Sequence, residues 1–181
     1  MDRAELGSLR RQEGIANAAG NGNEIYYTIC VVSDSEDNIL LKYANSGVSE
    51  GMWNFPGGHL ENDENHEQCA RREVLEETGL VLNSMAYHGI ITRYKDGIKH
   101  MVHVLSSNDF SGESRSSEEG EVRWFKRNEL PLSRMWEDVA VWLDHVNSGN
   151  AFDVTIRHGG SGKQETLLAL RTENKKARVL R

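Results

Sequence analysis

Long apolar runs are missing from this sequence, and so are clusters of cysteine. No stretch reaches the roughly 20 apolar residues that a membrane-spanning helix needs. Residues 1–24 lack the apolar segment of a secretory signal peptide. The two cysteines, Cys30 and Cys69, lie in strand-like and helix-like segments, which favours buried free thiols over a disulfide. We therefore expect a protein of the reducing cytoplasm that is neither secreted nor membrane-bound.

Positive charge is also in the minority. Lys and Arg number 21 against 28 Asp and Glu, and the formal net charge of −7 argues against nonspecific binding to polymeric nucleic acid or an anionic membrane. The 181 residues suit one domain with a buried core. We predict a polar, loosely ordered lead-in at residues 1–23, with a helix around Ala4–Gln12, a folded domain at residues 24–172, and a solvated basic tail at residues 173–181.

Acidic residues, in contrast, are regularly spaced between Gly58 and Leu80. Counted from Gly58, this stretch matches the pattern G-x5-E-x7-R-E-U-x-E-E-x-G-U, where U is aliphatic, at all nine specified positions. On a helix, Glu73, Glu76 and Glu77 fall within an arc of about 100°. Like charges at that spacing repel by about 0.2–0.5 kcal/mol per pair. A sequence that keeps all three carboxylates predicts a cation between them.

Flanking residues indicate the ends of this helix and the nature of the loop before it. Asn62 or Asp63 can cap its start, and Gly79 can take the left-handed conformation that ends it, with an apolar contact from Leu80. The segment Trp53–Gly58 runs from apolar residues into a Gly-Gly turn, where backbone can approach a ligand closely. The alternative, a solvated acidic helix face, does not account for the complete pattern.

On these nine positions the chain resembles the Nudix hydrolases. The resemblance implies an α+β (α/β) architecture, the Nudix fold, in which a curled mixed β-sheet is sandwiched between helices. It also implies that Glu73 and Glu76 are catalytic and that Arg72 orients a catalytic glutamate. The implied ligands of divalent cations are the Gly58 carbonyl and the carboxylates of Glu73, Glu76 and Glu77.

Magnesium, with manganese as a possible substitute, is the cation that these ligands favour. Every candidate ligand is a hard oxygen, and none of the seven histidines belongs to a His/Cys cluster with zinc spacing. Magnesium at a diphosphate neutralises charge on the phosphoryl oxygens and lowers the pKa of an attacking water.

A second acidic group, Glu118, Glu119 and Glu121, precedes the aromatic pair Trp124-Phe125. In Nudix enzymes a loop glutamate so placed is a further metal ligand or the general base. Glu121, next to the predicted strand, is the first candidate and Glu118 the second. The alternative for each is a solvated loop acid.

Further residues indicate a purine site. The segment Met135-Trp136-Glu137-Asp138 resembles one that lines the base pocket of MutT-like 8-oxo-dGTP diphosphatases, which implies that Trp136 stacks on the purine and Asp138 bonds its edge. Stacking contributes about 1–3 kcal/mol per base. Trp136 also fits the apolar stripe of a predicted helix at Ser133–Asn147, so a core role is the alternative. Val139 stands where the mammalian type has a second aspartate. This departure counts against a preference for 8-oxoguanine, though not against the purine site itself. Two loop residues complete the substrate-binding candidates: Phe55 and Gly57.

Alternating β-branched and aromatic residues predict the strands. Two neighbouring strands, Ile25–Ser33 and Asn38–Tyr43, are expected to pair as a hairpin. A second hairpin turns at Asp96-Gly97, the strongest short turn signal in the chain. The remaining predicted strands are Glu121–Phe125 and a last hairpin, Ala151–His158 with Glu165–Arg171, around Gly159–Gly162.

Together these features predict a magnesium-dependent pyrophosphohydrolase that converts a nucleoside triphosphate to the monophosphate and pyrophosphate. An oxidised purine dNTP such as 8-oxo-dGTP is the leading substrate. The alternatives are a broader nucleoside-diphosphate-X hydrolase acting on nucleotide sugars or ADP-ribose, and a non-catalytic Nudix module that senses a nucleotide. We expect the nucleotide to be the partner of a monomer or homodimer.

Overall fold

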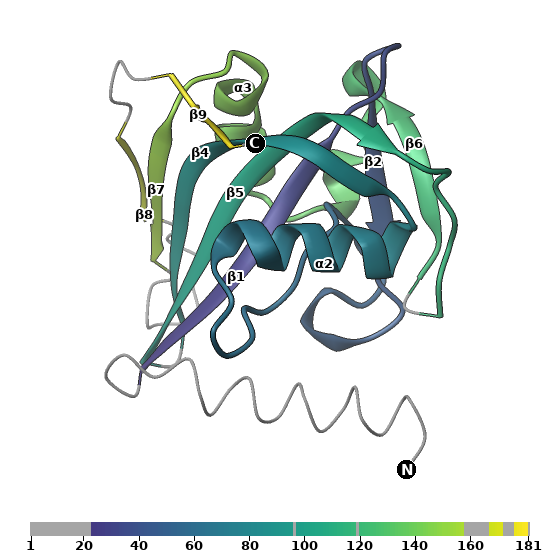
Figure 1. Ribbon diagram of the computed structural model, residues 1–181. Helices are drawn as coiled ribbons and strands as arrows, with labels where there is room; N and C mark the ends of the chain where they lie inside the picture. Colours follow the sequence, from purple (N-terminus) through teal and green to yellow (C-terminus); the bar gives the residue numbers. More distant parts are fainter. Residues whose placement is uncertain (1–22, 96, 119, 158–166, 172–175, 181) are drawn as a thin grey trace.

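The computed structural model describes residues 23–95, 97–118, 120–157, 167–171 and 176–180. The helix predicted around Ala4–Gln12 lies outside these residues. No helix within them has the length and apolarity that crossing a membrane requires. The elements follow in the order β1 (Glu24–Val32), β2 (Asn38–Tyr43), η1 (Gly47–Ser49), β3 (Trp53–Asn54), α2 (His66–Thr78), β4 (Val81–Lys95), β5 (Ile98–Ser111), β6 (Val122–Lys126), η2 (Arg127–Glu129), η3 (Leu132–Arg134), α3 (Val139–Asn147), β7 (Phe152–Arg157), β8 (Leu167–Arg171) and β9 (Arg178–Leu180) (Figure 1).

The strands form two sheets. The larger has the order β1-β5-β4-β7-β8, with β9 pairing to β4, and the smaller has the order β3-β2-β6. The larger sheet is mixed, because β1 runs parallel to β5 and β4 parallel to β7, whereas β4 is antiparallel to β5 and β9. The predicted α+β class with a mixed sheet is confirmed.

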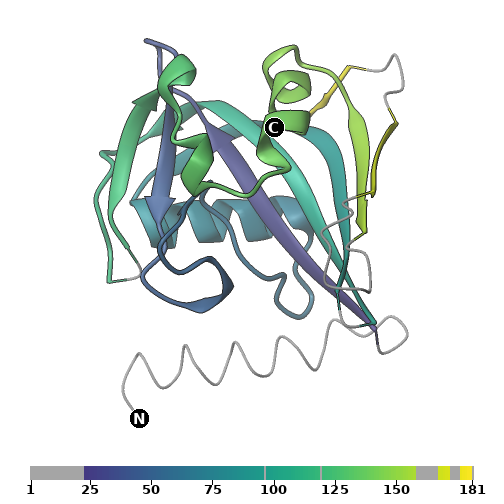
Figure 2. The ribbon, with the colours of Figure 1, turned by 180° about the vertical axis from the view of Figure 1, so that it is seen from behind.

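Both faces of the larger sheet are covered. The helix α2 lies across one face and α3 across the other, as the two opposite views show (Figures 1 and 2). Alternate residues of β1 serve different cores: Val31 packs in the cluster that includes α3, whereas Cys30 and Val32 pack in the cluster that includes α2. This alternation follows from the two-residue period of a strand. The predicted sandwich between helices is therefore present.

The predicted hairpin of β1 and β2 is wrong, although both strands exist. β1 pairs with β5 in parallel, and β2 joins β3 and β6; a single bridge between Ser33 and Ile39 links the two. The physical reason is burial on both faces. Leu40 packs in the cluster that includes α2, and Leu41 in the cluster that includes α3. Because β2 is buried on both faces, its backbone groups need strand partners inside the core, and these are β3 and β6. The hairpin of β4 and β5 is confirmed, with Lys95 opposite Ile98.

The second helix is shorter than predicted. It begins at Val139, not at Ser133, because Met135 has an extended conformation (φ −125°, ψ 172°) that ends the short η3 turn. Trp136 and Asp138 therefore precede the helix. Trp136 does not lie on a helical apolar stripe, contrary to the prediction. The predicted strand at Glu121–Phe125 is confirmed as β6.

The C-terminal part of the chain contributes to the larger sheet. β7 and β8 pair antiparallel as predicted, while the turn predicted at Gly159–Gly162 lies outside the described residues. The expectation of a solvated tail fails for β9, because it pairs with β4 and Leu180 packs against the buried Met85. The folded domain therefore includes residues beyond the predicted boundary at residue 172.

Both cysteines are buried and free, as predicted. Burial raises the pKa of Cys30 and of Cys69 to about 12, so neither thiol is ionised at neutral pH.

Candidate active site

The helix α2 presents the acidic pattern, and its ends are fixed by local hydrogen bonds. Asn65 is the N-cap: its Oδ1 accepts from the backbone N–H groups of Glu67 and Gln68 at 2.9 Å, and Gln68 Oε1 accepts from the Asn65 N–H. The predicted caps at Asn62 and Asp63 are wrong, because Asp63 has φ 64° within a turn. Gly79 ends the helix with φ 79°, as predicted.

Arg72 gathers three carboxylates of this region. Its Nε and Nη2 each donate to Glu64 at 2.9 Å, while Nη1 donates to Glu73 at 2.8 Å and to Glu76 at 3.3 Å. Burial alone would lower the pKa of Arg72, but the hydrogen bonds to Glu64 and Glu73 and the charges of these two carboxylates raise it above its ordinary value. Burial alone would raise the pKa of Glu64, but the hydrogen bond and the charge of Arg72 outweigh burial. The pKa of Glu64 is therefore lowered. Arg72 therefore holds Glu73 and Glu76 in place through one nitrogen.

Glu77 occupies a different environment from Glu76. The side chain of Glu77 is 3% exposed and that of Glu76 59% exposed. Glu77 accepts from Lys42 Nζ and, at 2.9 Å, from the backbone N–H of Gly57. Burial raises the pKa of Glu77 to about 7, although Lys42 acts in the opposite direction. The helix thus turns Glu77 inward, onto the segment Trp53–Gly58, here called the glycine loop. It turns Glu76 toward solvent.

The glycine loop lies against these carboxylates without room for side chains. An ideal Cβ on Gly58 would come within 2.3 Å of Glu73 Oε1, and one on Gly57, where φ is 155°, within 2.1 Å of the Thr28 carbonyl oxygen. The Gly58 carbonyl accepts from the Thr28 N–H at 2.8 Å, and Cys69 Sγ lies 3.9 Å from the same oxygen. Glycine at both positions is therefore required by close packing.

The donor set fits a hard divalent cation. Within the described ranges no three Asp, Glu, His or Cys side chains converge as a ready-made metal cage. Instead, oxygens of Glu73 and Glu76 meet at Arg72 Nη1, and Glu77 meets Lys42, so cationic nitrogens stand among the carboxylates. Carboxylate and carbonyl oxygens are the ligands that Mg²⁺ prefers. The residues that could hold such an ion are Gly58, Glu73, Glu76 and Glu77.

The segment that carries Glu118 and Glu121, here called the acidic loop, approaches this site through β2. Lys42 is paired in register with Val122, and the Tyr43 N–H donates to the Glu121 carbonyl at 2.8 Å. The Glu121 side chain is half exposed and accepts from Arg123 at 2.5 Å. Glu118 is exposed, and Glu119 lies outside the described residues.

The predicted base pocket forms a buried polar cluster. Asp138 is 7% exposed and accepts from Arg93 Nη2 at 2.7 and 2.9 Å and from Trp142 Nε1 at 2.9 Å. Trp136 is partly buried; its Nε1 donates to Ser49 Oγ at 3.2 Å, and Arg93 Cζ lies 5.2 Å from the centre of its ring. Phe55 is not part of this surface, because it is buried and packs against Trp142 with 5.4 Å between ring centres.

Sequence reasoning missed a row of side chains, the polar strip, that leads from the glycine loop to this cluster. It consists of His59, Tyr27, His100 and Arg93. The ring of Tyr27 lies 4.2 Å from that of His59, its hydroxyl is 3.1 Å from His100 Nδ1, and His100 is opposite Arg93 in register. The Asp96-Gly97 turn could have revealed this last pairing, because it sets Lys95 opposite Ile98 and hence Arg93 opposite His100.

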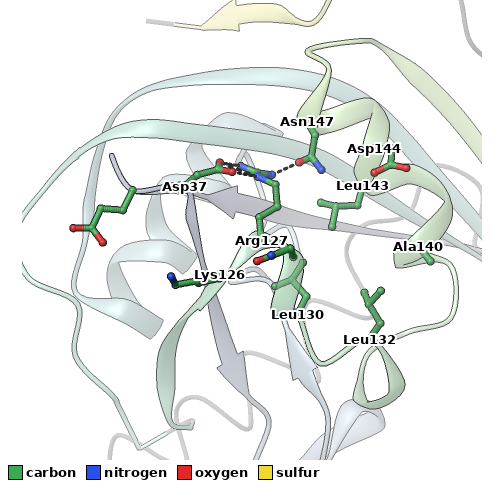
Figure 3. Close-up of a pocket in the computed structure, with 11 residues that line it drawn as sticks. Asp37, Lys126, Arg127, Leu130, Leu132, Ala140, Leu143, Asp144 and Asn147 are labelled. Carbon is green, nitrogen blue, oxygen red and sulfur yellow. Dashed lines mark hydrogen bonds and ion pairs between the residues drawn. The ribbon is translucent and has the colours of Figure 1, made fainter.

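A pocket of the molecule lies elsewhere, between the start of η2 and α3 (Figure 3). In it Arg127 donates to both oxygens of Asp37, at 2.8 and 2.9 Å from Nε, and to Asn147. None of the predicted site residues lines this pocket. It therefore does not belong to the candidate active site.

The chain is similar to known proteins in sequence and in fold. The NUDIX domain model matches residues 26–146. Two similar proteins bear the name oxidized purine nucleoside triphosphate hydrolase: that of Danio rerio is 35% identical over 107 residues (58% of this chain, 69% of that protein), and that of Mus musculus 31% identical over 119 residues (65% and 76%). The crystal structure of the mMutator MutT protein from Bacillus halodurans superposes with a TM-score of 0.67 and 24% identity, covering 83% of this chain and 99% of that one, and shows the same fold.

The family match covers well over half of the chain and includes the glycine loop, α2 and β4. The chain belongs to the Nudix hydrolase family.

Proposed function

We propose that this protein is a magnesium-dependent nucleoside triphosphate pyrophosphohydrolase that acts on oxidised purine dNTPs such as 8-oxo-dGTP. Nudix hydrolases use divalent metal ions and act on nucleotides; magnesium and the oxidised purine are the specific parts of the proposal. The observation that carries it is the contact of Glu73 with Gly58 and of Glu77 with Gly57, which sets the acidic helix against a loop that a diphosphate can approach. The names of the fish and mouse relatives support the substrate class.

The helix carboxylates would hold the metal. Glu73, Glu76 and Glu77 supply hard oxygens, with the Gly58 carbonyl as a fourth candidate and the loop acids Glu118 and Glu121 as further ones. When bound, magnesium neutralises charge on the phosphoryl oxygens and lowers the pKa of the attacking water.

The other charged residues have supporting roles in this proposal. Arg72 keeps Glu73 and Glu76 oriented, as its hydrogen bonds to both carboxylates indicate. Glu121, or Glu118 in its place, accepts the proton of the water as general base. Water adds to a phosphorus and a phosphoanhydride bond breaks, so that nucleoside monophosphate and pyrophosphate leave.

The base is proposed to lie at Trp136 and Asp138. Trp136 is partly exposed at the surface of the buried cluster, which suits a stacking partner, and Asp138 lies two residues further along. Gly57 would let the backbone approach the nucleotide closely. Phe55 is buried, so it would support the pocket by packing and would not contact the nucleotide. We propose a cytoplasmic monomer or homodimer, in keeping with two buried thiols.

A substrate panel tests the proposal. Hydrolysis with magnesium would be measured for 8-oxo-dGTP, dGTP, dATP, dCTP, ADP-ribose and a nucleotide sugar, with manganese and calcium as alternative ions. We expect the highest kcat/KM for an oxidised purine dNTP, with monophosphate and pyrophosphate as products. Preference for ADP-ribose or a nucleotide sugar would replace the substrate class, and no turnover of any member would replace the enzyme by a nucleotide-sensing module.

A further inference from the structure

Arg93 lies between the two residues predicted to bind the base. We propose that Arg93, held in position by Asp138 and Trp136, reads the purine edge and selects bases with a carbonyl group at position 6 over bases with an amino group there. The inference rests on the proposed function, because it takes the base of the nucleotide to lie at this cluster.

The carboxylate of Asp138 already has hydrogen-bond partners within the protein. Arg93 Nη2 donates to both of its oxygens, and Trp142 Nε1 donates to Oδ2. The carboxylate is nearly buried, and a buried carboxylate that gives up such partners is left with an uncompensated charge. Asp138 therefore acts as a positioning residue for Arg93 and is a poor candidate for a free acceptor facing the base.

The guanidinium of Arg93 has more N–H donors than its contacts with Asp138 use. Among the described residues its side-chain hydrogen bonds all come from Nη2, which leaves N–H groups on Nε and Nη1. Its side chain is 21% exposed, so these donors are not sealed in the core. The ring of Trp136, 5.2 Å from Cζ, holds the guanidinium from a second direction. Two neighbours thus fix the orientation of a donor group at the surface of the pocket.

Arg93 also lies at the end of the polar strip that begins at the glycine loop. The polar strip runs from His59, next to Gly58, through Tyr27 and His100 to Arg93. These side chains share the sheet face of Ile91, Val102 and the α3 core cluster. A nucleotide whose phosphates lie at the glycine loop and whose base lies at Arg93 would follow this strip.

The chemistry of the guanidinium then decides which base fits. Arginine only donates hydrogen bonds, and the carbonyl oxygen at position 6 of guanine, which 8-oxoguanine and hypoxanthine share, accepts them. Adenine presents an amino donor at position 6, which a guanidinium cannot accept. Hypoxanthine and adenine differ at this edge and carry no 2-amino group, so dIMP and dAMP form a matched pair of probes.

The experiment measures equilibrium binding of dIMP, dGMP, dAMP and deoxyribose 5-phosphate without requiring turnover. We expect the wild type to bind dIMP at least roughly ten-fold more tightly than dAMP. Arg93→Met should abolish this preference while leaving the affinity for deoxyribose 5-phosphate unchanged. The matched control is Arg127→Met: Arg127 is similarly exposed (26%) and also pairs with an aspartate, but it lies in the separate pocket of Figure 3.

Because Arg93→Met leaves Asp138 buried without its cation, the double variant Arg93→Met/Asp138→Asn is included, and melting curves identify the variant that is folded. A preference for dIMP that survives in the folded variant overturns the inference. So does an equal loss for all ligands, deoxyribose 5-phosphate included, since that would place Arg93 at a phosphate. Hydrolysis of triphosphates is assayed separately: its absence overturns the proposed function, while base preference in the binding assay still supports the role of Arg93.

Discussion

The carboxylate of Glu73 occupies the space that a side chain on residue 58 would need. An ideal Cβ on Gly58 would lie 2.3 Å from Oε1 and 2.5 Å from Cδ of Glu73, whereas one on Gly57 would meet backbone, 2.1 Å from the Thr28 carbonyl oxygen. The two adjacent glycines are thus required for different reasons. One leaves space for a movable side chain, and the other leaves space for a neighbouring strand.

This difference predicts opposite outcomes for two alanine substitutions. Gly58→Ala should displace the end of Glu73, lowering kcat strongly with only a small change in melting temperature. Gly57→Ala should lower the melting temperature by several degrees, since neither β1 nor the loop can yield easily and φ is positive. Enzyme assays and thermal melting of both variants test this. Full activity of Gly58→Ala would show that Glu73 is not needed where it stands.

Removing the exposed glutamate of the proposed metal site, Glu76, should separate activity from stability. Glu76→Gln takes one charge from a crowded acidic face, so kcat should fall by orders of magnitude while the melting temperature without metal is unchanged or higher. Glu67→Gln is the control, because Glu67 lies on the same helix and pairs with Arg71. Retained turnover in Glu76→Gln with magnesium present would contradict the proposed ligand.

The acidic loop is tested by a pair of substitutions. Glu121→Gln should depress kcat more than it changes KM if this carboxylate is the general base or a ligand recruited with substrate. Its present partner is Arg123, at 2.5 Å, so the side chain must turn away from that arginine to act. If Glu118→Gln alone is inactive, the role belongs to Glu118; activity in both variants would place the base on α2.

The capping box makes a prediction about stability alone. Asn65→Ala removes the acceptor of two backbone N–H groups and should cost about 1 kcal/mol of unfolding free energy. Asn62→Ala serves as the control, because Asn62 does not cap the helix in this structure, and it should be close to neutral. Urea unfolding of the two variants measures the difference. A larger loss for Asn62→Ala would mean that the helix starts earlier.

A histidine on the opposite sheet face should make stability depend on pH. His103 stacks on His66 and is hydrogen-bonded to Tyr87; burial, with a smaller contribution from His66, lowers its pKa from 6.5 to about 4. The folded protein therefore binds this proton less readily than the unfolded chain does. The stability contributed by neutral His103 is fully present above pH 6.5 and is lost progressively as pH falls toward 4.

Urea unfolding at pH 7 and pH 5 measures this loss. His103→Gln, which cannot be protonated, should lose distinctly less unfolding free energy between the two pH values than the wild type. Identical pH dependence in both proteins would assign the effect to other groups.

Local signals in the sequence predicted local structure well. The Asp96-Gly97 turn and the Gly79 helix end are set by backbone conformations that a few adjacent residues determine. The partners of β1 and β2 were mispredicted because strand pairing depends on residues far apart in the chain. The start of α3 was missed since a single extended residue, Met135, interrupts an otherwise helical period.

The candidate site divides in the same way. The spacing of Glu73, Glu76 and Glu77 places them on one helix, and the contacts of Arg72 agree with its expected orienting role. That Arg93 joins Asp138 could not be predicted, because β4 and the segment before α3 meet only in the folded protein. Side-chain partners across elements require the tertiary structure, even where each element is readily predicted.

The irregularities of β4 determine which of its side chains share a face of the sheet with Arg93. The register with β5 shifts at three places, between Leu82 and Ser84, between Ser84 and Ala86, and between Tyr87 and Gly89. Side chains alternate between faces, so adding or removing one residue between Gly89 and Arg93 would turn the arginine to the opposite side of the sheet. A change of chain length in this single strand would therefore remove the proposed base contact of Arg93 while the acidic helix stays untouched.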